Sequence, residues 1–299
     1  MQSVVVTEHL APATVAEVQH LVTTAEERDG FRPISDQAWL DLSNGTTAPS
    51  IRVTLTADDD SVIAYAQAVD IGVEWTLETV VHPDVRIEFA PIATRLITAV
   101  TDAMHERGGG TLAWTVLGPT PQHDAVAASF GLQASRRLHQ MRRALPTGLD
   151  FDVRTRSFDA VRDVDDWVRV NARAFAWNPE QGTWTVASLR MRMAEPWFDA
   201  DGFLIHERDG RMAAFCWTKV HATATPPLGE IYVIAVDPDF HGLGLGRAMT
   251  LAGLHSLSER GLRTGMLFVD SDNVAAVRLY DTLGFAITRT DCLYTAAIT

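Results

Sequence analysis

The sequence predicts an α/β protein made of two tandem domains, each a mixed twisted sheet flanked by helices. Helical and strand-like periodicities alternate along the 299 residues, which indicates sheets covered by helices. The same order of elements occurs twice, and a segment rich in turn formers, Pro146-Thr147-Gly148, lies between the two occurrences. We therefore expect an internal duplication, with one domain over residues 1–148 and a second over residues 149–299.

The first repeat begins with a helical pattern and continues as a hairpin around Asp58-Asp59-Asp60. Its later helices end at glycines, which are frequent helix terminators. In chain order, the expected elements are a helix over 14–29, strands over 51–56 and 62–69, a strand and turn over 78–84, a helix over 92–106, a strand over 112–117 and a helix over 124–130.

The second repeat shows the same order, and its hairpin turns at Asp209-Gly210. The expected elements are a helix over 164–175, strands over 203–207, 212–221 and 231–236, a loop, a helix that ends at Arg260, a strand over 266–269 and a helix over 274–283. The agreement between the two series is the evidence for duplication.

The composition is that of a globular protein with a sizeable core, since 46% of residues are hydrophobic and 21% are charged. The net charge of −13 disfavours binding to nucleic acid or to an anionic membrane, and it is compatible with a cationic small substrate. Cys216 and Cys292 lie in strand-like runs and form neither a disulfide framework nor a zinc set, so we expect buried structural thiols and no metal. Because there is no run of 18 apolar residues and no basic start at Met1-Gln2-Ser3, we expect a cytoplasmic protein, and we expect a monomer.

The segment from Gly229 to Arg247 is the most informative part of the sequence. It reads as a buried strand, a turn marked by Pro238, a glycine-rich loop and the start of a helix. Such a loop turns several backbone N–H groups toward one anion, and the helix behind it adds the positive end of its dipole. Gly244 and Gly246 allow the backbone to approach a phosphate where a Cβ atom would obstruct it. The segment therefore predicts a site for the phosphates of a cofactor.

This loop resembles the pyrophosphate loop of the GNAT acetyltransferases, which hold acetyl-CoA there. The family form is Gln or Arg, two residues, Gly, one residue and Gly, whereas this chain has His241-x-x-Gly244-x-Gly246. A dinucleotide-binding loop is the alternative, but the turn over 236–239 is longer than the tight Rossmann turn. The segment from Asn273 to Phe285 also resembles the GNAT helix beside the pantetheine arm. The resemblance implies two GNAT-like domains, with acetyl-CoA as the co-substrate.

Amide formation from a thioester requires a base for the amine, a donor for the oxyanion and a proton for the thiolate. Glu230, bordered by the apolar residues 231–233, is the candidate base, and the alternative is a solvated glutamate at the start of the strand. Tyr280 is the candidate acid, and the alternative is a core tyrosine anchored by a hydrogen bond. Arg278 pairs either with a CoA phosphate or with an acid such as Asp281. No covalent nucleophile is required, so we expect direct transfer in a ternary complex.

The first repeat lacks the phosphate loop, because Phe89 and Pro91 stand where the second repeat has its two glycines. A phenylalanine blocks approach of the backbone, a proline removes an N–H donor, and Glu88 adds a negative charge. Trp75 and Ala127 occupy the positions of the two candidate catalytic side chains. We expect a non-catalytic first domain, kept for structure and for shaping the substrate pocket.

Four segments, 171–184, 197–202, 217–221 and 269–273, together resemble the mycothiol synthases. These are tandem GNAT enzymes whose C-terminal copy is active, and they acetylate the cysteinyl amine of desacetylmycothiol, a cysteine–glucosamine–inositol conjugate. The resemblance is dense over residues 153–299 and thin over 1–150. It implies the same reaction for this chain.

The resemblance also implies which residues serve each role. The base falls on Glu230 and the acid on Tyr280. The acetyl-CoA contacts fall on Ile234, Ala235, Val236, His241, Gly242, Leu243, Gly244, Leu245, Gly246, Arg247, Asn273, Val274, Ala275, Ala276, Val277 and Arg278, and the acceptor contacts fall on Asp36, Glu180, Lys219, Glu230 and Phe268. The family usually has a glutamate at the position of Asp36 and a tyrosine at the position of Phe268.

Two alternatives stay open at this point. One is a GNAT enzyme for another amine, such as a peptide N-terminus or an aminosugar. The other is a catalytically silent acyl-CoA-binding sensor, which the pair Glu230 and Tyr280 disfavours. In each case we expect small-molecule ligands and neither nucleic acid nor membrane as a partner.

Overall fold

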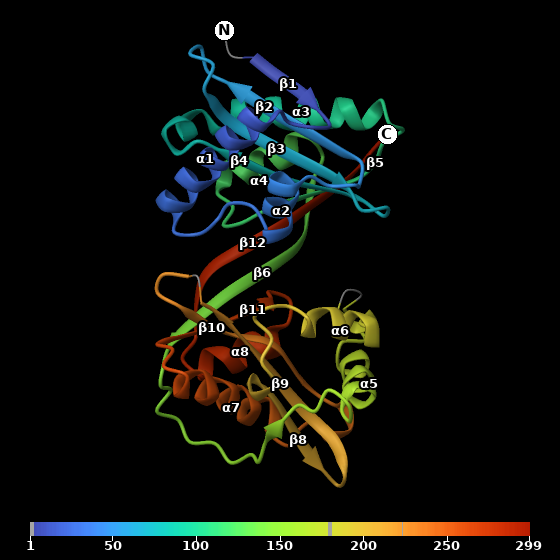
Figure 1. Ribbon diagram of the computed structural model, residues 1–299, viewed down its shortest axis with the longest axis vertical. Coiled ribbons are helices and arrows are strands. Elements are labelled where there is room, and N and C mark those ends of the chain that lie inside the picture. The colour runs from blue at the N-terminus through green and yellow to red at the C-terminus, as the bar shows by residue number, and fades with distance from the viewer. Residues whose placement is uncertain (1–2, 179–180, 223) are drawn as a thin grey trace. The chain divides into compact units, whose positions relative to one another are not determined.

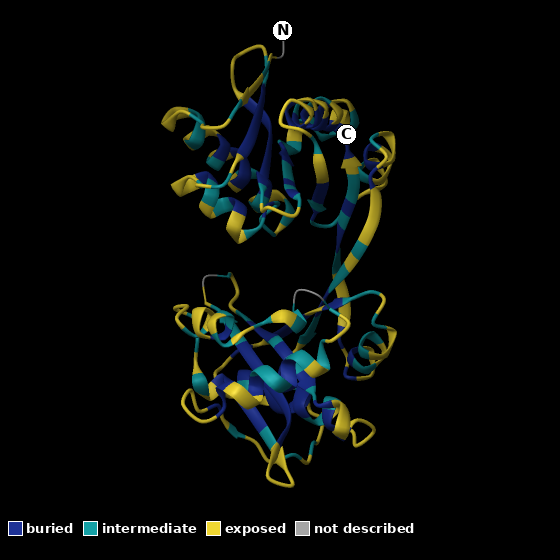
Figure 2. Cartoon of the chain, turned by 90° about the vertical axis from the view of Figure 1, so that its right-hand side faces the viewer, coloured by how far each residue is buried: buried dark blue, intermediate teal, exposed yellow. Residues whose placement is uncertain are grey.

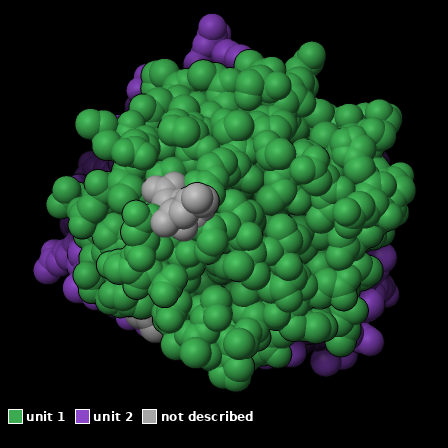
Figure 3. Space-filling view, turned by 90° about the horizontal axis from the view of Figure 1, so that it is seen from above, with its two compact units in different colours: residues 1–138, 289–299 green, residues 139–288 purple. Residues whose placement is uncertain are grey.

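The computed structural model describes residues 3–178, 181–222 and 224–299 (Figure 1). The chain divides into two compact units, which Figure 3 shows in different colours. Unit 1 comprises residues 1–138 and 289–299, and unit 2 comprises residues 139–288. Each unit is a mixed sheet with helices on its faces, which confirms the predicted fold class.

Unit 1 has the strand order β1-β2-β3-β4-β5-β12, in which β4 and β5 are parallel and their neighbours antiparallel. Alternate residues of β3 face opposite sides, so that Ala66 packs in the cluster with α3 and Tyr65 in the cluster with α1. Its elements are β1 (Ser3–Thr7), α1 (Pro12–Asp29), α2 (Asp36–Asn44), β2 (Ser50–Thr56), β3 (Val62–Asp70), β4 (Trp75–Val81), the 3₁₀ helix η1 (Pro83–Glu88), α3 (Phe89–His105), β5 (Gly110–Val116) and α4 (Pro121–Ser129).

Unit 2 has the strand order β6-β11-β10-β9-β8-β7, with β10 and β11 parallel. Cys216 of β9 packs on the α7 side of the sheet, and its neighbour Trp217 packs on the α5 side. The strands of the sheet are mostly buried, as the dark blue ribbon of Figure 2 shows. Its elements are β7 (Arg156–Ser157), α5 (Val164–Ala174), η2 (Gln181–Thr183), α6 (Val186–Met193), η3 (Ala200–Gly202), β8 (Phe203–Arg208), β9 (Arg211–His221), β10 (Leu228–Val236), η4 (Pro238–Phe240), α7 (Leu245–Glu259), β11 (Thr264–Asp270) and α8 (Val274–Thr282).

Two long strands, β6 (Gln133–Ala144) and β12 (Ala286–Ile298), each contribute residues to both units. From Cys292 to Ile298, β12 pairs with β5, and Tyr294 donates a hydrogen bond of 2.7 Å to Asp124. In unit 2, β6 lies next to β11. The last strand of the second repeat, β12, therefore belongs mainly to unit 1, and β6 is divided equally between the two units. The unit boundaries thus differ from the predicted segments 1–148 and 149–299.

Most of the predicted elements are present within a few residues of their expected bounds. The sequence patterns did not predict β1, α2, α6, β6 or β12. Cys216 and Cys292 are both buried, as expected, and burial raises the pKa of the Cys216 thiol to about 12. Across the described residues, every helix is too short or too polar to span a bilayer.

Candidate active site

A β-bulge interrupts the hairpin of β9 and β10. The register pairs Ile231 with Thr218 and Val233 with Trp217, so Tyr232 is the extra residue and has no partner on β9 in this ladder. The corresponding hairpin of unit 1, β3 and β4, runs in unbroken register from Ala64 to Asp70. A bulge re-aims side chains and frees backbone groups, so the two units differ at this point of the sheet.

The parallel strands β10 and β11 separate beyond the bulge. Their pairing covers Gly229 to Ile231 on β10, although β10 continues to Val236 and β11 to Asp270. The edge of β10 that carries Ile234, Ala235 and Val236 thus lies beyond its paired stretch with β11. Backbone N–H and C=O groups at such an edge need partners from elsewhere, and a ligand with amide groups supplies them.

The predicted phosphate loop lies between η4 and α7. Gly242 and Gly244 have φ values of +79° and +73°, a left-handed conformation that favours glycine. Gly244 is the N-cap of α7, whose first-turn N–H groups therefore point out of the helix end. Gly246 lies within the first turn, where a Cβ atom would meet only Leu279 at 3.6 Å. The loop has the conformation that an anion site requires.

Buried charge fixes the turn that precedes this loop. Asp237 is fully buried, and its carboxylate lies 3.3 Å from Arg169 and 3.1 Å from Arg173, both on α5. It also accepts the backbone N–H of Asp239 at 3.0 Å, and Asp239 in turn pairs with Arg211 at 2.6 Å. These contacts hold the loop against the sheet from the α5 side.

Helix α8 packs near the start of α7, where its Leu279 lies 3.6 Å from the Cβ position of Gly246. The Asn273 side chain accepts the N–H of Ala276 at 3.2 Å and so caps the helix. Tyr280 is buried and packs edge-on against Phe285, with ring centroids 5.8 Å apart. Burial raises the pKa of Tyr280 well above its ordinary value, so its hydroxyl keeps its proton at neutral pH. One hydrophobic cluster joins α7 to the end of β10 and to α8, through Ile234, Val236 and residues 276, 277, 279 and 280.

Glu230 is buried, with a side chain that is 8% exposed, which rules out the solvated alternative. Its Oε2 atom lies 2.6 Å from Nε2 of His221, the last residue of β9. Sequence reasoning did not select His221. The signal for it was its position two residues after Lys219, since alternate residues of a strand share a face and Lys219 pairs directly with Glu230.

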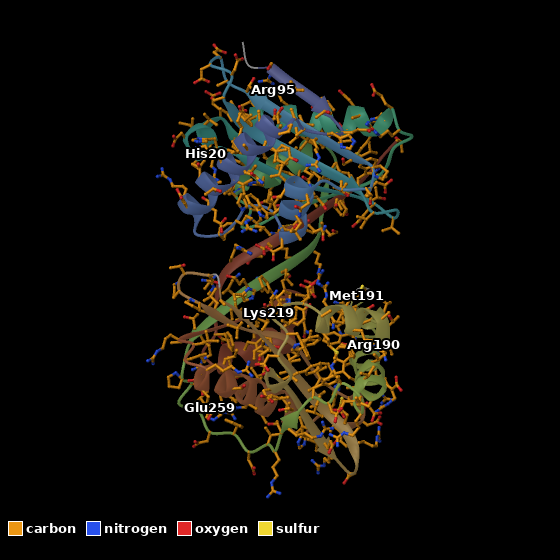
Figure 4. All side chains as sticks on the ribbon, viewed as in Figure 1. His20, Arg95, Arg190, Met191, Lys219 and Glu259 are labelled. Carbon is orange, nitrogen blue, oxygen red and sulfur yellow. The ribbon has the colours of Figure 1, made fainter. Side chains whose placement is uncertain are left out.

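Lys219 belongs to an aromatic wall on the same face of the sheet. Its Nζ atom lies 4.8 Å from the Trp197 ring centroid and 5.7 Å from that of Tyr232, which are cation–π contacts. Figure 4 labels Lys219 among the side chains of unit 2. Burial, with the Glu230 carboxylate and Glu195 nearby, raises the pKa of Tyr232 despite the opposing effect of Arg192. The base candidate therefore has an ordered, partly apolar neighbourhood.

The other acceptor-binding candidates come from different elements of the chain. Phe268 lies on β11 and is 36% exposed. Asp36 lies in unit 1, at the start of α2, where its exposed carboxylate pairs with Arg32 at 3.3 Å. Glu180 lies outside the described residues.

In unit 1 a pocket of about 330 Å³ opens where β4 and β5 cease to pair, beyond Glu78. Phe89 is buried and lines this pocket, and its ring centroid lies 4.1 Å from that of His123. Burial, together with Arg86, lowers the pKa of His123 to about 4, so its imidazole is neutral at neutral pH. Arg86 is held by two hydrogen bonds of 2.7 Å to Asp29. The position of the phosphate loop is therefore filled by an aromatic side chain in this unit.

Comparisons with known proteins agree with this description. The acetyltransferase (GNAT) family model matches residues 170–285. A mycothiol acetyltransferase of Thermobispora bispora is 43% identical, covering 95% of this chain and 96% of the relative, and one of Acidothermus cellulolyticus is 40% identical, covering 95% and 92%.

Solved structures support the fold. A GCN5-related N-acetyltransferase from Sphaerobacter thermophilus has a TM-score of 0.76 at 20% identity and covers 99% of this chain and 96% of its own. A tandem GNAT protein from the clavulanic acid biosynthesis pathway has a TM-score of 0.70 at 17% identity and covers 100% and 99%. With identity above 30% over nearly the whole length, the chain belongs to the mycothiol acetyltransferase family of tandem GNAT acetyltransferases.

Proposed function

We propose that this acetyltransferase moves the acetyl group of acetyl-CoA to the cysteinyl amine of desacetylmycothiol, giving mycothiol and CoA by direct attack in a ternary complex. Family membership supports the reaction. The observation within the structure that carries it is the buried Glu230 on β10, next to the bulge and to the separated edge of the parallel strands.

We assign acetyl-CoA to the edge of β10 and the loop before α7. The thioester of acetyl-CoA supplies the activated acyl group. Residues 241–247 turn backbone N–H groups and the positive end of α7 toward the pyrophosphate. Residues 234–236 lie at the unpaired edge, where backbone groups are able to bond the amides of the pantetheine arm. Residues 273–278 line the other side from α8.

The proposed acid and base are both buried side chains. Glu230 accepts a proton from the acceptor amine, because an amine must be neutral to attack. The bulge at Tyr232 frees a backbone group that is suited to stabilising developing charge on the thioester oxygen. Tyr280, which stays protonated because burial raises its pKa, donates a proton to the departing sulfur.

The acceptor contacts rest on the family resemblance. We propose that Lys219 and Phe268 of unit 2 bind the acceptor, together with Asp36 and Glu180. Of these, Lys219 has the clearest structural support, because its ammonium group lies against two aromatic rings and directly across from Glu230. A monomeric state and a cytoplasmic location stay predictions.

The direct test is a turnover assay with purified protein, desacetylmycothiol and acetyl-CoA, followed by mass spectrometry of the products. We expect the acceptor to gain one acetyl group. A free cysteinyl peptide and an aminosugar serve as competing acceptors. Equal use of all three would favour a broader amine acetyltransferase, and acetyl-CoA binding without any product would favour the sensor.

For unit 1 we propose a non-catalytic role. Phe89 lines the pocket at the start of α3, and Glu88 precedes it with a negative charge. Both features oppose a pyrophosphate by bulk and by charge. Calorimetry should therefore give about one tightly bound CoA per chain, and two tight sites would contradict this proposal.

A further inference from the structure

His221, which is neither the proposed base Glu230 nor the proposed acid Tyr280, contacts Glu230 directly. The register of β9 and β10 places Lys219 across from Glu230, and His221 lies two residues further along the same strand. Side chains two residues apart share a face, so the imidazole lies on the same side of the sheet as the carboxylate. The distance of 2.6 Å between Nε2 and Oε2 is short enough for direct proton exchange.

The two side chains differ in exposure. Glu230 is 8% exposed and His221 is 29% exposed. A proton that the buried carboxylate takes from a substrate must leave before the next turnover, because a protonated carboxyl group is not a base. His221 provides a polar partner that is nearer to solvent than the carboxylate itself.

The charged and titratable neighbours of this pair come from several elements. Strand β9 contributes Lys219, and β10 contributes Tyr232. Arg192 and Glu195, in and after α6, act electrostatically on Tyr232. Strand β11 places the uncharged Met266 beside Glu230. On the opposite face, α7 packs on Gly229 and Ile231 with apolar side chains.

We propose that His221 relays the proton of Glu230 to solvent. This proposal rests on the proposed role of Glu230 as the base. The N–H bond of the acceptor amine breaks and an O–H bond forms on Glu230. Rotation of the carboxyl group brings this proton to Nε2 of His221, where the O–H bond breaks and an N–H bond forms. The same proton then leaves Nε2 for water, so that both side chains return to their starting states. One proton moves from the amine to solvent, and no oxidation state changes.

A second reading of the same contact is purely geometric, in which the imidazole only orients the carboxylate. The two roles differ in what a replacement must retain. A glutamine places an N–H donor close to the position of Nε2 but does not take up or release a proton at neutral pH. His221 is thus a positioning residue that acts through Glu230, and the relay adds the requirement that its side chain both accepts and releases a proton.

The experiment compares His221→Gln and His221→Ala with the wild-type chain in the acetyl-transfer assay. We expect His221→Gln to lower kcat by about 10–100-fold, which is at or below the lower end of the range for groups that act directly as acid or base, with an unchanged KM for acetyl-CoA. In His221→Ala, added imidazole should restore turnover in proportion to its concentration. The matched control is His255→Gln, since His255 forms a His–Glu pair at 3.3 Å with Glu259 on α7.

Wild-type turnover in His221→Gln would overturn the relay, and so would a failure of imidazole to change the rate of a folded His221→Ala protein. Thermal melting establishes that each variant is folded. Glu230→Gln separates this proposal from the one it rests on. If Glu230→Gln is inactive while the His221 variants are unaffected, only the relay fails. If Glu230→Gln is fully active, the base assignment itself fails.

Discussion

Gly244→Ala isolates the conformational requirement of the phosphate loop. Gly244 has φ +73°, and a Cβ atom built on it meets nothing within 4 Å, so the substitution adds backbone strain without a steric clash. The left-handed conformation costs an L-residue about 1–2 kcal/mol. Since the loop must adopt this conformation to present its N–H groups, acetyl-CoA affinity should fall by the corresponding factor of roughly 5–30. At saturating acetyl-CoA, kcat should change little.

The matched control is Gly131→Ala in unit 1. Gly131 has φ +71° and is equally open, so the same strain is introduced away from the loop. Gly131→Ala should lose about 1–2 kcal/mol of stability, seen as a decrease in Tm of roughly 2–8 °C. Gly244→Ala should lose less, because its loop relaxes without acetyl-CoA and takes up the strain on binding. Calorimetric titration with CoA distinguishes them, because only Gly244→Ala should bind it more weakly. Equal affinities in the two variants would refute the assignment of the loop to the phosphates.

Three further predictions concern the reaction and the two cores. Glu230→Gln and Tyr280→Phe should each lower kcat by about 10²–10⁴-fold while CoA binding, measured by calorimetry, is kept; near-wild-type turnover would remove both residues from these roles. Burial lowers the pKa of His123 to about 4 from 6.5, so the unfolded chain binds more protons between these values, and unit 1 should lose stability as pH falls from 6.5 to 4. The loss, on the order of 2 kcal/mol after allowance for partial exposure, should be absent in His123→Asn when urea unfolding is followed against pH. Gly253→Ala should lower Tm, because its Cβ atom would lie 2.5 Å from Sγ of Cys216. The overpacking costs about 1–3 kcal/mol, which exceeds the gain in helix propensity of about 1 kcal/mol. An unchanged or higher Tm would show that the sheet yields at this contact.

The sequence alone determined the features that depend on near neighbours. The helices over 14–29 and 92–106 and the hairpin strands 51–56 and 62–69 were predicted closely, because helical and strand periodicities are written within a few residues. The phosphate loop was also predicted from the sequence, because the spacing of its glycines and the helix that follows them are local properties. The alternative of a solvated Glu230 was not decided locally, and it is wrong because the sheet buries that side chain.

Only the tertiary structure decided which distant residues meet. The exchange of β6 and β12 joins Tyr294 to Asp124, 170 residues away, and no local pattern encodes such a pairing partner. The contact of His221 with Glu230 depends on the register of a hairpin with a bulge at Tyr232, and a shift of one residue would place the imidazole on the other face. Pairing and register are set by the burial of side chains from the whole unit, which is why they appear only once the chain is folded.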